Sequence, residues 1–504
     1  MLCVKELTSV PASVHRCRGL LRRVGLLIDL VFLTIKQEMA SSCCSAPSSS
    51  AVVDVVDTIS LPNTYSTWPE ISGHLSALSS KAESGPETFQ RALEHDGETV
   101  SISLLDKVLG KAQYITEDHF YGTLLPWIAD KALEVESLFK ESDYSILNLY
   151  NGRCQEIQLS RQQVCCLMAL AFFNTFKELP GSAHGAGGYQ QFTFTGFLSF
   201  PFYTSQESKL ICLLHYFERI RQAETNKEDT FLNVNIAFSR KQLPKASIED
   251  PNTFWGQCDH PLVPFESLAE GLIEGANGCL QVDFANEYIG GGVLGMGNVQ
   301  EEIRFVINPE CLVSILFCQS MDHLESILIT GAEQFSSYTG YGGRFQFTEP
   351  YNDPNPTDKF KRKQVNIVAI DATPFDFFTS AAQFQRNGIN RELYKAYCGF
   401  IHKISMDDNE SGENVPVATG NWGCGAFGGD KEMKTLLQWM AATKARRPVR
   451  YFTHNDERFA ERQKIVTQFL LSKKVTVGRL YNVLVRGKTT IGDVFSYVME
   501  AFDN

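Results

Sequence analysis

The spacing of hydrophobic residues changes near position 230. Between about residues 100 and 225, apolar positions recur at helical spacing, most clearly in SRQQVCCLMALAFFNTF from Ser160 and in SQESKLICLLHYFERI from Ser205 to Ile220. The Ser160 hydroxyl can cap the helix that follows it. We interpret the aromatic residues of both stretches as core residues, so this region is predicted to be a helical accessory domain.

After residue 230, short β-rich runs alternate with helical patterns. The predicted strands are Phe231–Phe238, Leu280–Ala285, Ile303–Ile307, Ser326–Thr330, Val365–Asp371, Val415–Thr419 and Val449–Thr453. Helical patterns cover Asn390–Ile404 and Lys431–Ala445. This alternation predicts an α/β layered domain with a largely buried sheet, whose ligands bind in loops beyond the strand ends.

These patterns divide the chain into three predicted parts: residues 1–60, a helical domain over 61–228 and an α/β domain over 229–504. The first part contains four arginines before an apolar stretch, Val24 to Ile35, that is too short to span a bilayer and resembles a weak targeting peptide. Met39 is a plausible alternative start, and residues 39–60 are typical of a flexible lead-in because they are rich in Ser, Ala and Val.

Composition narrows the classes of ligand. The 504 residues carry a formal net charge of −12, which disfavours a broad nucleic-acid-binding surface and leaves local recognition of an anion by backbone N–H groups. The 14 cysteines form no CxxC pair and the ten histidines no HExxH motif, so we expect free thiols in a reducing compartment and no metal site. The nucleus and the cytoplasm both fit, and the basic cluster from Lys359 to Lys363 is either a solvated loop or an import signal.

A glycine run and a pair of glutamates follow the predicted strand at Leu280. The run Gly290–Gly292 can bring the backbone close to a ligand, and Glu301 and Glu302 precede the predicted strand IRFVI. Adjacent residues entering a strand point to opposite faces, so one carboxyl could be desolvated as an acid while the other stays ionised. Such a pair suits glycoside hydrolysis. The alternatives are a plain glycine turn and a solvated pair of glutamates.

A second glycine-rich segment, ATGNWGCGAFGGD, covers Ala418 to Asp430. It contains a GxGxxG pattern from Gly423 to Gly428, between a predicted strand and a predicted helix. Its N–H groups and the helix start would form a cradle for a diphosphate. A Rossmann NAD site is the rival interpretation, but no acidic residue ends a strand some twenty residues further on.

These residues carry a family resemblance. The spacing GGG, seven residues, QEE resembles the signature of poly(ADP-ribose) glycohydrolases, and the flanks VDFAN and EEIRFVINPE match it too. The similarity runs from roughly Arg161 to about Thr453. It implies an α/β fold with a macrodomain-like mixed sheet sandwiched by helices, preceded by an all-helical accessory domain.

The resemblance also implies a division of roles. Glu302 would be the general acid, and Glu301 and Asn286 would hold ribose hydroxyls. Asp283 would support the site or orient the substrate. Gln300 would contact the substrate, and Gly290, Gly291 and Gly292 would approach the ribose and diphosphate. The diphosphate would lie against Asn421, Cys424, Gly425, Ala426 and Phe427.

The resemblance is less regular around the predicted adenine site. Tyr341 matches a tyrosine that lines the substrate cleft. Glu274 matches a residue near the adenine, although the loop around it is one residue short. His454 stands where the animal-type pattern has a phenylalanine facing the adenine, which affects adenine affinity and not the chemistry.

The predicted function is hydrolysis of poly(ADP-ribose) to ADP-ribose, with no metal or other cofactor. The predicted partners are the polymer and poly-ADP-ribosylated proteins, without sequence-specific nucleic-acid binding and without a membrane. Two rivals from other classes are a macrodomain that binds ADP-ribose without cutting it and a nucleotide-dependent oxidoreductase.

Overall fold

The computed structural model describes residues 58–503, apart from 81–82, 95–98, 112–113, 177–187, 200–202, 246–247, 249, 405–414 and 488–489. The targeting-like segment and almost all of the predicted lead-in therefore lie outside the described residues. Among the helices that are described, none has the length and apolar character needed to cross a membrane.

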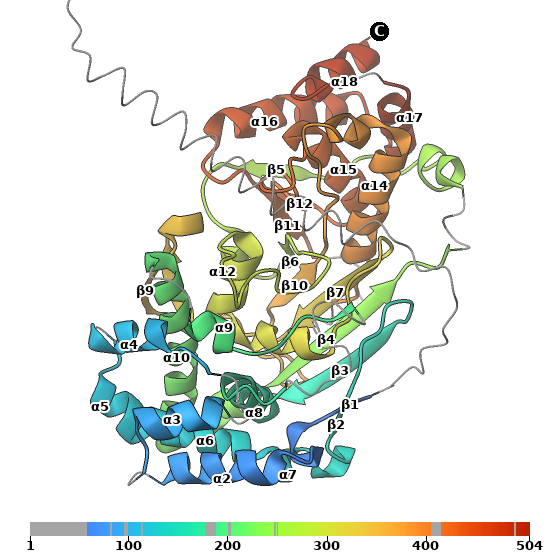
Figure 1. Ribbon diagram of the computed structural model, residues 1–504. Coiled ribbons are helices and arrows are strands. Elements are labelled where there is room, and N and C mark those ends of the chain that lie inside the picture. The colour runs from blue at the N-terminus through green and yellow to red at the C-terminus, as the bar shows by residue number, and fades with distance from the viewer. Residues whose placement is uncertain are drawn as a thin grey trace, which may run out of the picture. The chain divides into compact units, whose positions relative to one another are not determined.

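A mixed sheet forms the centre of the described chain (Figure 1). In the described part it has eight strands, in the spatial order β3 (Gln155–Ser160), β4 (Asn235–Gln242), β7 (Glu325–Thr330), β10 (Asn366–Ala369), β6 (Leu280–Asp283), β11 (Val417–Gly420), β12 (Val449–Phe452) and β5 (Phe265–Leu268). The pairs from β3 to β10 are antiparallel, and those from β10 to β5 are parallel. The parallel strands therefore end at one common edge of the sheet.

Both faces of this sheet are covered, because successive side chains along its strands pack alternately into two hydrophobic cores. In β7, Ile327 and Ile329 pack into one core and Leu328 into the other, and β10 divides Ile367 from Val368 in the same way. The second core includes α14 (Arg386–Phe400) and α15 (Lys431–Lys444) together with α16 (Glu457–Ser472), α17 (Val477–Arg486) and α18 (Val494–Asp503). The predicted layered α/β domain is confirmed.

The first core joins the sheet to the helical part of the chain. The α-helices of the helical part are α2 (Trp68–Ser79), α3 (Pro86–Leu93), α4 (Ser103–Gly110), α5 (Glu117–His119), α6 (Leu125–Leu133), α7 (Val135–Leu138), α8 (Arg161–Phe172), α9 (Thr195–Leu198), α10 (Thr204–Asn226) and α11 (Asp229–Leu232). Ser160 caps α8 as predicted, because its hydroxyl accepts the N–H of Gln163 while the Gln163 side chain accepts the N–H of Ser160.

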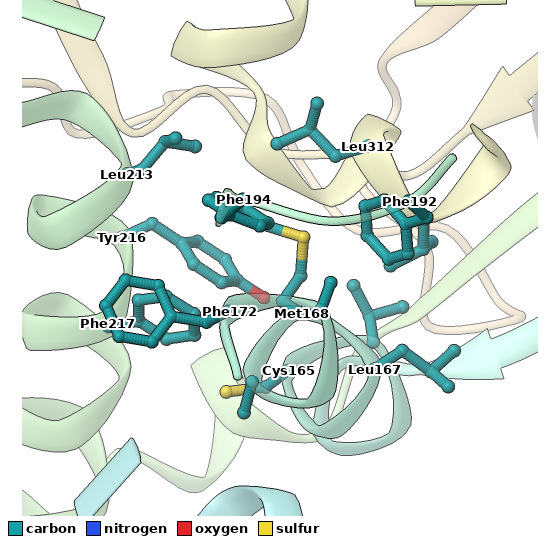
Figure 2. Packing of buried hydrophobic residues seen from close by; sticks show 14 of the residues in the cluster. Cys165, Leu167, Met168, Phe172, Phe192, Phe194, Leu213, Tyr216, Phe217 and Leu312 are labelled. Carbon is teal, nitrogen blue, oxygen red and sulfur yellow. The ribbon is translucent and has the colours of Figure 1, made fainter. Parts of the chain in front are cut away.

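Packing of large side chains in this first core connects the helical part to the segment that follows the two glutamates in the chain. Figure 2 shows Met168 and Phe172 of α8 facing Tyr216 and Phe217 of α10, with Leu312 on the opposite side. Leu312 belongs to η8 (Pro309–Val313), which follows the helix that carries Glu301 and Glu302. The first core thus packs against the segment that follows helix α12 and helps to hold that helix in place.

Two sequence predictions need correction. The helical region also contributes β3, which extends the main sheet by pairing with β4. Ile303–Ile307 is wrong as a strand, because it is the second half of helix α12 (Gln300–Ile307). A short, mostly apolar run does not distinguish a strand from a buried helix. The helix is favoured here because the Glu302 side chain accepts the N–H of Val299, at the N-cap position, over 2.8 Å.

Candidate functional site

Glu301 and Glu302 are held by backbone N–H groups of the segment between β6 and α12, residues 284–299, called here the glycine loop. Glu301 accepts the N–H of Asn286 over 2.8 Å and that of Gly290 over 2.7 Å, one on each oxygen. Glu302 accepts the N–H of Gly292 over 3.0 Å. Both carboxylates therefore point to the same loop, and the predicted division onto opposite faces is wrong because the residues lie in a helix.

The close packing of these carboxylates explains why the loop needs glycine. Gly291 has φ of +49°, and a Cβ built there would lie 2.6 Å from Glu301 Oε2 and 2.7 Å from Glu302 Oε1. A Cβ on Gly297 would lie 2.6 Å from Glu302 Cδ. The glycines thus bring the backbone against the two carboxyl groups.

Asp283, at the end of β6, lies in the same buried cluster. Its side chain is fully buried, and neither carboxylate oxygen accepts a hydrogen bond from the described residues. Burial raises the pKa of Asp283 to about 8, the charge of Arg304 lowers it and that of Glu302 raises it. Burial, followed by the charges of Asp283 and Glu302, raises the pKa of Glu301 well above its usual value. The cluster therefore favours retention of protons near neutral pH.

Gln300 and Asn286 connect the strand to the helix. The Gln300 side chain accepts the N–H of Phe284 over 2.7 Å and donates to the carbonyl of Val282 over 3.1 Å. The Asn286 side chain accepts the N–H of Tyr288 over 3.0 Å. Both predicted substrate contacts are therefore adjacent to the glutamates, where they also fix the backbone of the loop.

The second glycine-rich segment follows β11 and leads into α15, as predicted. Residues 421–430, called here the cradle loop, turn sharply at Gly423, where φ is +71°. Within the described chain, the N–H groups of Gly425, Ala426 and Phe427 donate to no protein atom. Three consecutive unpaired donors form a site for an anion. The start of α15 is already capped, since Asp430 accepts the N–H of Met433 over 2.8 Å.

The remaining cradle residues form its frame. Asn421 donates to the carbonyl of Thr453 over 3.2 Å and accepts the hydroxyl of Tyr451 over 3.2 Å. The thiol of Cys424 donates to the carbonyl of Trp422 over 3.4 Å, and burial raises its pKa. The two contacts of Asn421 fix the loop to β12, the next strand of the sheet, and to the residue that follows it.

Two of the predicted residues, Tyr341 and His454, lie at the β12 side of the site, and a third, Glu274, lies on a short helix that contacts β6 and β11. The rings of Tyr341 and His454 are 4.9 Å apart between centroids. Burial raises the pKa of Tyr341, and its hydroxyl is hydrogen-bonded to the backbone of Gln300, next to the glutamates. Glu274, in η7 (Ile273–Gly275), accepts the hydroxyl of Tyr338.

Comparisons with known proteins agree with this geometry. The helical domain of poly(ADP-ribose) glycohydrolase matches residues 113–240, and the macro domain fold of the same family matches residues 252–461. Poly(ADP-ribose) glycohydrolase 1 of Arabidopsis thaliana is 33% identical over 445 residues, which cover 73% of this chain and 78% of the relative. The chain belongs to the poly(ADP-ribose) glycohydrolase family. It is therefore a hydrolase of the glycosidase class with a macrodomain fold and a helical domain, as the sequence predicted.

Two further relatives support this membership. Probable poly(ADP-ribose) glycohydrolase 2 of Arabidopsis thaliana is 32% identical over 421 residues, covering 73% of this chain and 78% of the relative. Poly(ADP-ribose) glycohydrolase 1 of Caenorhabditis elegans is 34% identical over 367 residues, covering 71% of this chain and 43% of the relative.

Sequence reasoning missed several residues around this glycohydrolase site. Arg304, on α12, is buried and donates to the Gln281 side chain over 2.6 Å. Lys209, on α10, donates to two carbonyls of the glycine loop. A charged residue within an apolar pattern was the available signal for Arg304. Lys209 could not be found in this way, because its contacts join positions more than eighty residues apart.

A cavity of about 1100 Å³ adjoins the glycine loop from the helical side. Its wall includes Asn286, Gly291 and Gly292 from the loop, and Thr99 and Gln190 from the helical part. Every side chain that lines it is uncharged. The glycine loop is therefore accessible from this cavity.

Proposed function

We propose that this chain hydrolyses the ribose–ribose O-glycosidic bonds of poly(ADP-ribose) and releases ADP-ribose. The observation that carries the proposal is the pair of glutamates held against the glycine loop after β6, while the neighbouring strand β11 leads into a loop with three unpaired N–H groups. Carboxyl groups of this kind serve acid and base catalysis at an anomeric carbon. The relatives from Arabidopsis thaliana and Caenorhabditis elegans are named for the same activity.

In this proposal Glu302 is the general acid and base. It protonates the leaving 2′-oxygen as the ribose C1″–O bond breaks, and its carboxylate then takes a proton from the water that attacks C1″. Each oxygen of Glu302 accepts one backbone N–H, so lone pairs remain for the substrate and the water. General acid catalysis of this kind contributes about two to four powers of ten in rate.

Glu301 and Asn286 hold the hydroxyl groups of the ribose. Glu301 is 2% exposed and accepts an N–H on each oxygen, so its orientation is fixed before the substrate arrives. Burial favours the protonated form of Asp283, which reduces the negative charge behind the pair. Positioning and electrostatics of this kind supply the remainder of the rate enhancement.

The rest of the substrate extends along the parallel strand ends. The N–H groups of Gly425, Ala426 and Phe427 bind the diphosphate, and Tyr341 and His454 contact the adenine, with Glu274 close by. Protonation of the 2′-oxygen by Glu302 makes it a good leaving group, so the reaction proceeds without a metal or other cofactor. The partners are the polymer and the proteins that carry it.

The test is incubation of labelled poly(ADP-ribose) with the full chain and identification of the products. Release of ADP-ribose supports the proposal. Binding of ADP-ribose without any release would instead support the non-catalytic reader. Tryptophan fluorescence, measured with NAD and with ADP-ribose in separate titrations, distinguishes an oxidoreductase from a glycohydrolase. Quenching by NAD and not by ADP-ribose would contradict a glycohydrolase site.

A further inference from the structure

A lysine of the helical part enters the glycine loop. Lys209, on α10, is 1% exposed, and its Nζ donates to the carbonyls of Gly295 and Gly297 over 2.9 and 2.8 Å. The ring of Phe197 lies 5.3 Å from the same nitrogen. Among the described residues, no carboxylate forms an ion pair with Lys209.

This environment differs from that of other buried lysines in the chain. Lys434 is paired with Glu392 and Lys395 with Asp371, so each has a counter-charge in contact. An unpaired ammonium is costly to bury, and burial lowers the pKa of Lys209 to about 7. The charge of Glu302 acts in the opposite direction and is the one charge that acts on this ammonium among the described residues.

The two carbonyls connect Lys209 to Glu302. The N–H groups of Gly295 and Gly297 both donate to the carbonyl of Gly292, over 2.9 and 3.0 Å. The N–H of Gly292 in turn donates to Glu302. Lys209 therefore holds the turn that presents a hydrogen bond to the proposed general acid.

We propose that Lys209 is a positioning residue through which the helical domain completes the active site. Its ammonium holds the glycine loop in the geometry that orients Glu302, and loss of its proton loosens that hold. This inference rests on the proposed role of Glu302. It explains why a glycohydrolase macrodomain needs the helical part, since the macrodomain residues alone provide no donor to these two carbonyls in the described chain.

The test compares Lys209→Met and Lys209→Arg with wild type, and Lys107→Met, which removes a partly exposed ion pair with Glu207, is the control. We expect Lys209→Met to lower kcat by about 100-fold, since a small misplacement of a reacting group has an effect of this order. KM and the affinity for ADP-ribose should stay within about 2-fold, as should every parameter of the control.

The pH profile separates positioning from a general structural role. The kcat of wild type should fall as pH rises through about 7, where Lys209 loses its proton, and the permanently charged Lys209→Arg should lack this step. Retained kcat in Lys209→Met, or the same step in wild type and in Lys209→Arg, would overturn the inference. If Lys209→Met does not fold, the profile of Lys209→Arg decides. Absence of cleavage by wild type would instead refute the proposed function.

An independent observation concerns two exposed aromatic side chains. Phe377 and Phe378, in the loop after β10, are each 90% exposed, and their ring centroids are 5.6 Å apart. The turn that displays them is fixed, because Asp376 accepts the N–H groups of Phe378 and Thr379, each over 2.8 Å. Neighbouring aromatic side chains with this exposure mark an interaction surface.

The position of this loop relative to the substrate identifies an occupant. The N–H of Phe375 donates to the carbonyl of Phe427 over 2.8 Å, which joins the loop to the cradle loop. His454 follows β12, the cradle loop follows β11 and Asp283 ends β6, so the proposed path from adenine to scissile ribose follows the strand order. The next strand in that order is β10, which leads to the aromatic pair.

We infer that Phe377 and Phe378 form a stacking platform for the adenine of the polymer unit on the leaving side of the bond. This inference also rests on the proposed function. Every base offers an aromatic face, and stacking on aromatic side chains gives affinity to single-stranded nucleotide polymers. The platform would therefore favour polymer over smaller glycosides of ADP-ribose.

The test is the double variant F377A/F378A, assayed on poly(ADP-ribose) and on an ADP-ribosyl glycoside of a small alcohol. Loss of stacking should raise KM for the polymer roughly 10-fold and leave KM for the small glycoside unchanged. Phe360→Ala, which removes another exposed phenylalanine, should affect neither. Equal kinetics of the double variant and wild type on polymer would overturn the platform while leaving the proposed function intact.

Discussion

The backbone N–H of Gly292 donates to Oε1 of Glu302 over 3.0 Å, so the glycine run binds the proposed acid before any substrate is present. The residue before it, Gly291, has no room for a side chain because both carboxylates lie against its Cα. The glycines and the glutamates therefore form one unit, in which each depends on the position of the other.

Replacement of Gly291 by alanine should disrupt this unit. The added Cβ would lie 2.6 Å from Glu301 Oε2, at a positive φ that alanine adopts at a cost of about 1–2 kcal/mol. We expect cleavage to fall at least 100-fold, measured on labelled polymer. Gly73→Ala, in open space on α2, should leave cleavage unchanged, and equal activity of the two variants would contradict this account.

The cradle loop offers a matched pair of glycines. A Cβ at Gly423 would lie 2.5 Å from Ala372 Cβ, whereas a Cβ at Gly425 meets nothing within 4 Å. We therefore expect Gly423→Ala to weaken ADP-ribose binding about 10-fold or more and Gly425→Ala to change it little. Calorimetric titration with ADP-ribose measures both, and an unchanged affinity in Gly423→Ala would contradict this account of the cradle loop.

Stability should depend on pH through Asp283. Its folded pKa of about 8 is above the usual value near 4, so between these values the folded protein binds a proton that the unfolded chain has lost. The stabilisation is fully present below pH 4 and is lost as pH rises through 8. Asp283→Asn removes this dependence. Tm measured from pH 5 to 9 should therefore fall more steeply in wild type than in the variant, and parallel curves would refute the assignment.

The buried Arg161 should be important for stability. It donates to Glu310 over 2.6 Å and to Glu333 over 2.8 Å, and its side chain is fully buried. Arg161→Met leaves the buried Glu310 without an ion-pair partner and Glu333 with Lys363 alone, 3.8 Å away, which destabilises by about 3–5 kcal/mol. Arg219→Met, which removes a partly exposed pair with Glu228, should cost about 1 kcal/mol or less. Urea unfolding compares the two variants, and similar losses would contradict this interpretation.

Much of the fold could be predicted because its signals are local. Strand β7 and helices α8 and α15 follow from apolar spacing and from caps such as Ser160 and Asp430. Helix α12 could not be predicted, because the short run IRFVI, apolar apart from Arg304, has no period that separates helix from strand, and its helical state depends on the contact of Glu302 with Val299. The family signature located the glutamates, but the contribution of Lys209 depends on tertiary contacts that no spacing encodes.

The central claim is that the carboxyl group of Glu302 acts as the proton donor. Glu302→Gln keeps the shape and the contact with the N–H of Gly292 but cannot cycle a proton, so it tests this claim directly. We expect polymer cleavage to fall at least 100-fold while the affinity for ADP-ribose stays within about 2-fold of wild type. Glu287→Gln, at an exposed position of the same loop, should cleave normally. Turnover by Glu302→Gln at the wild-type rate would contradict the account.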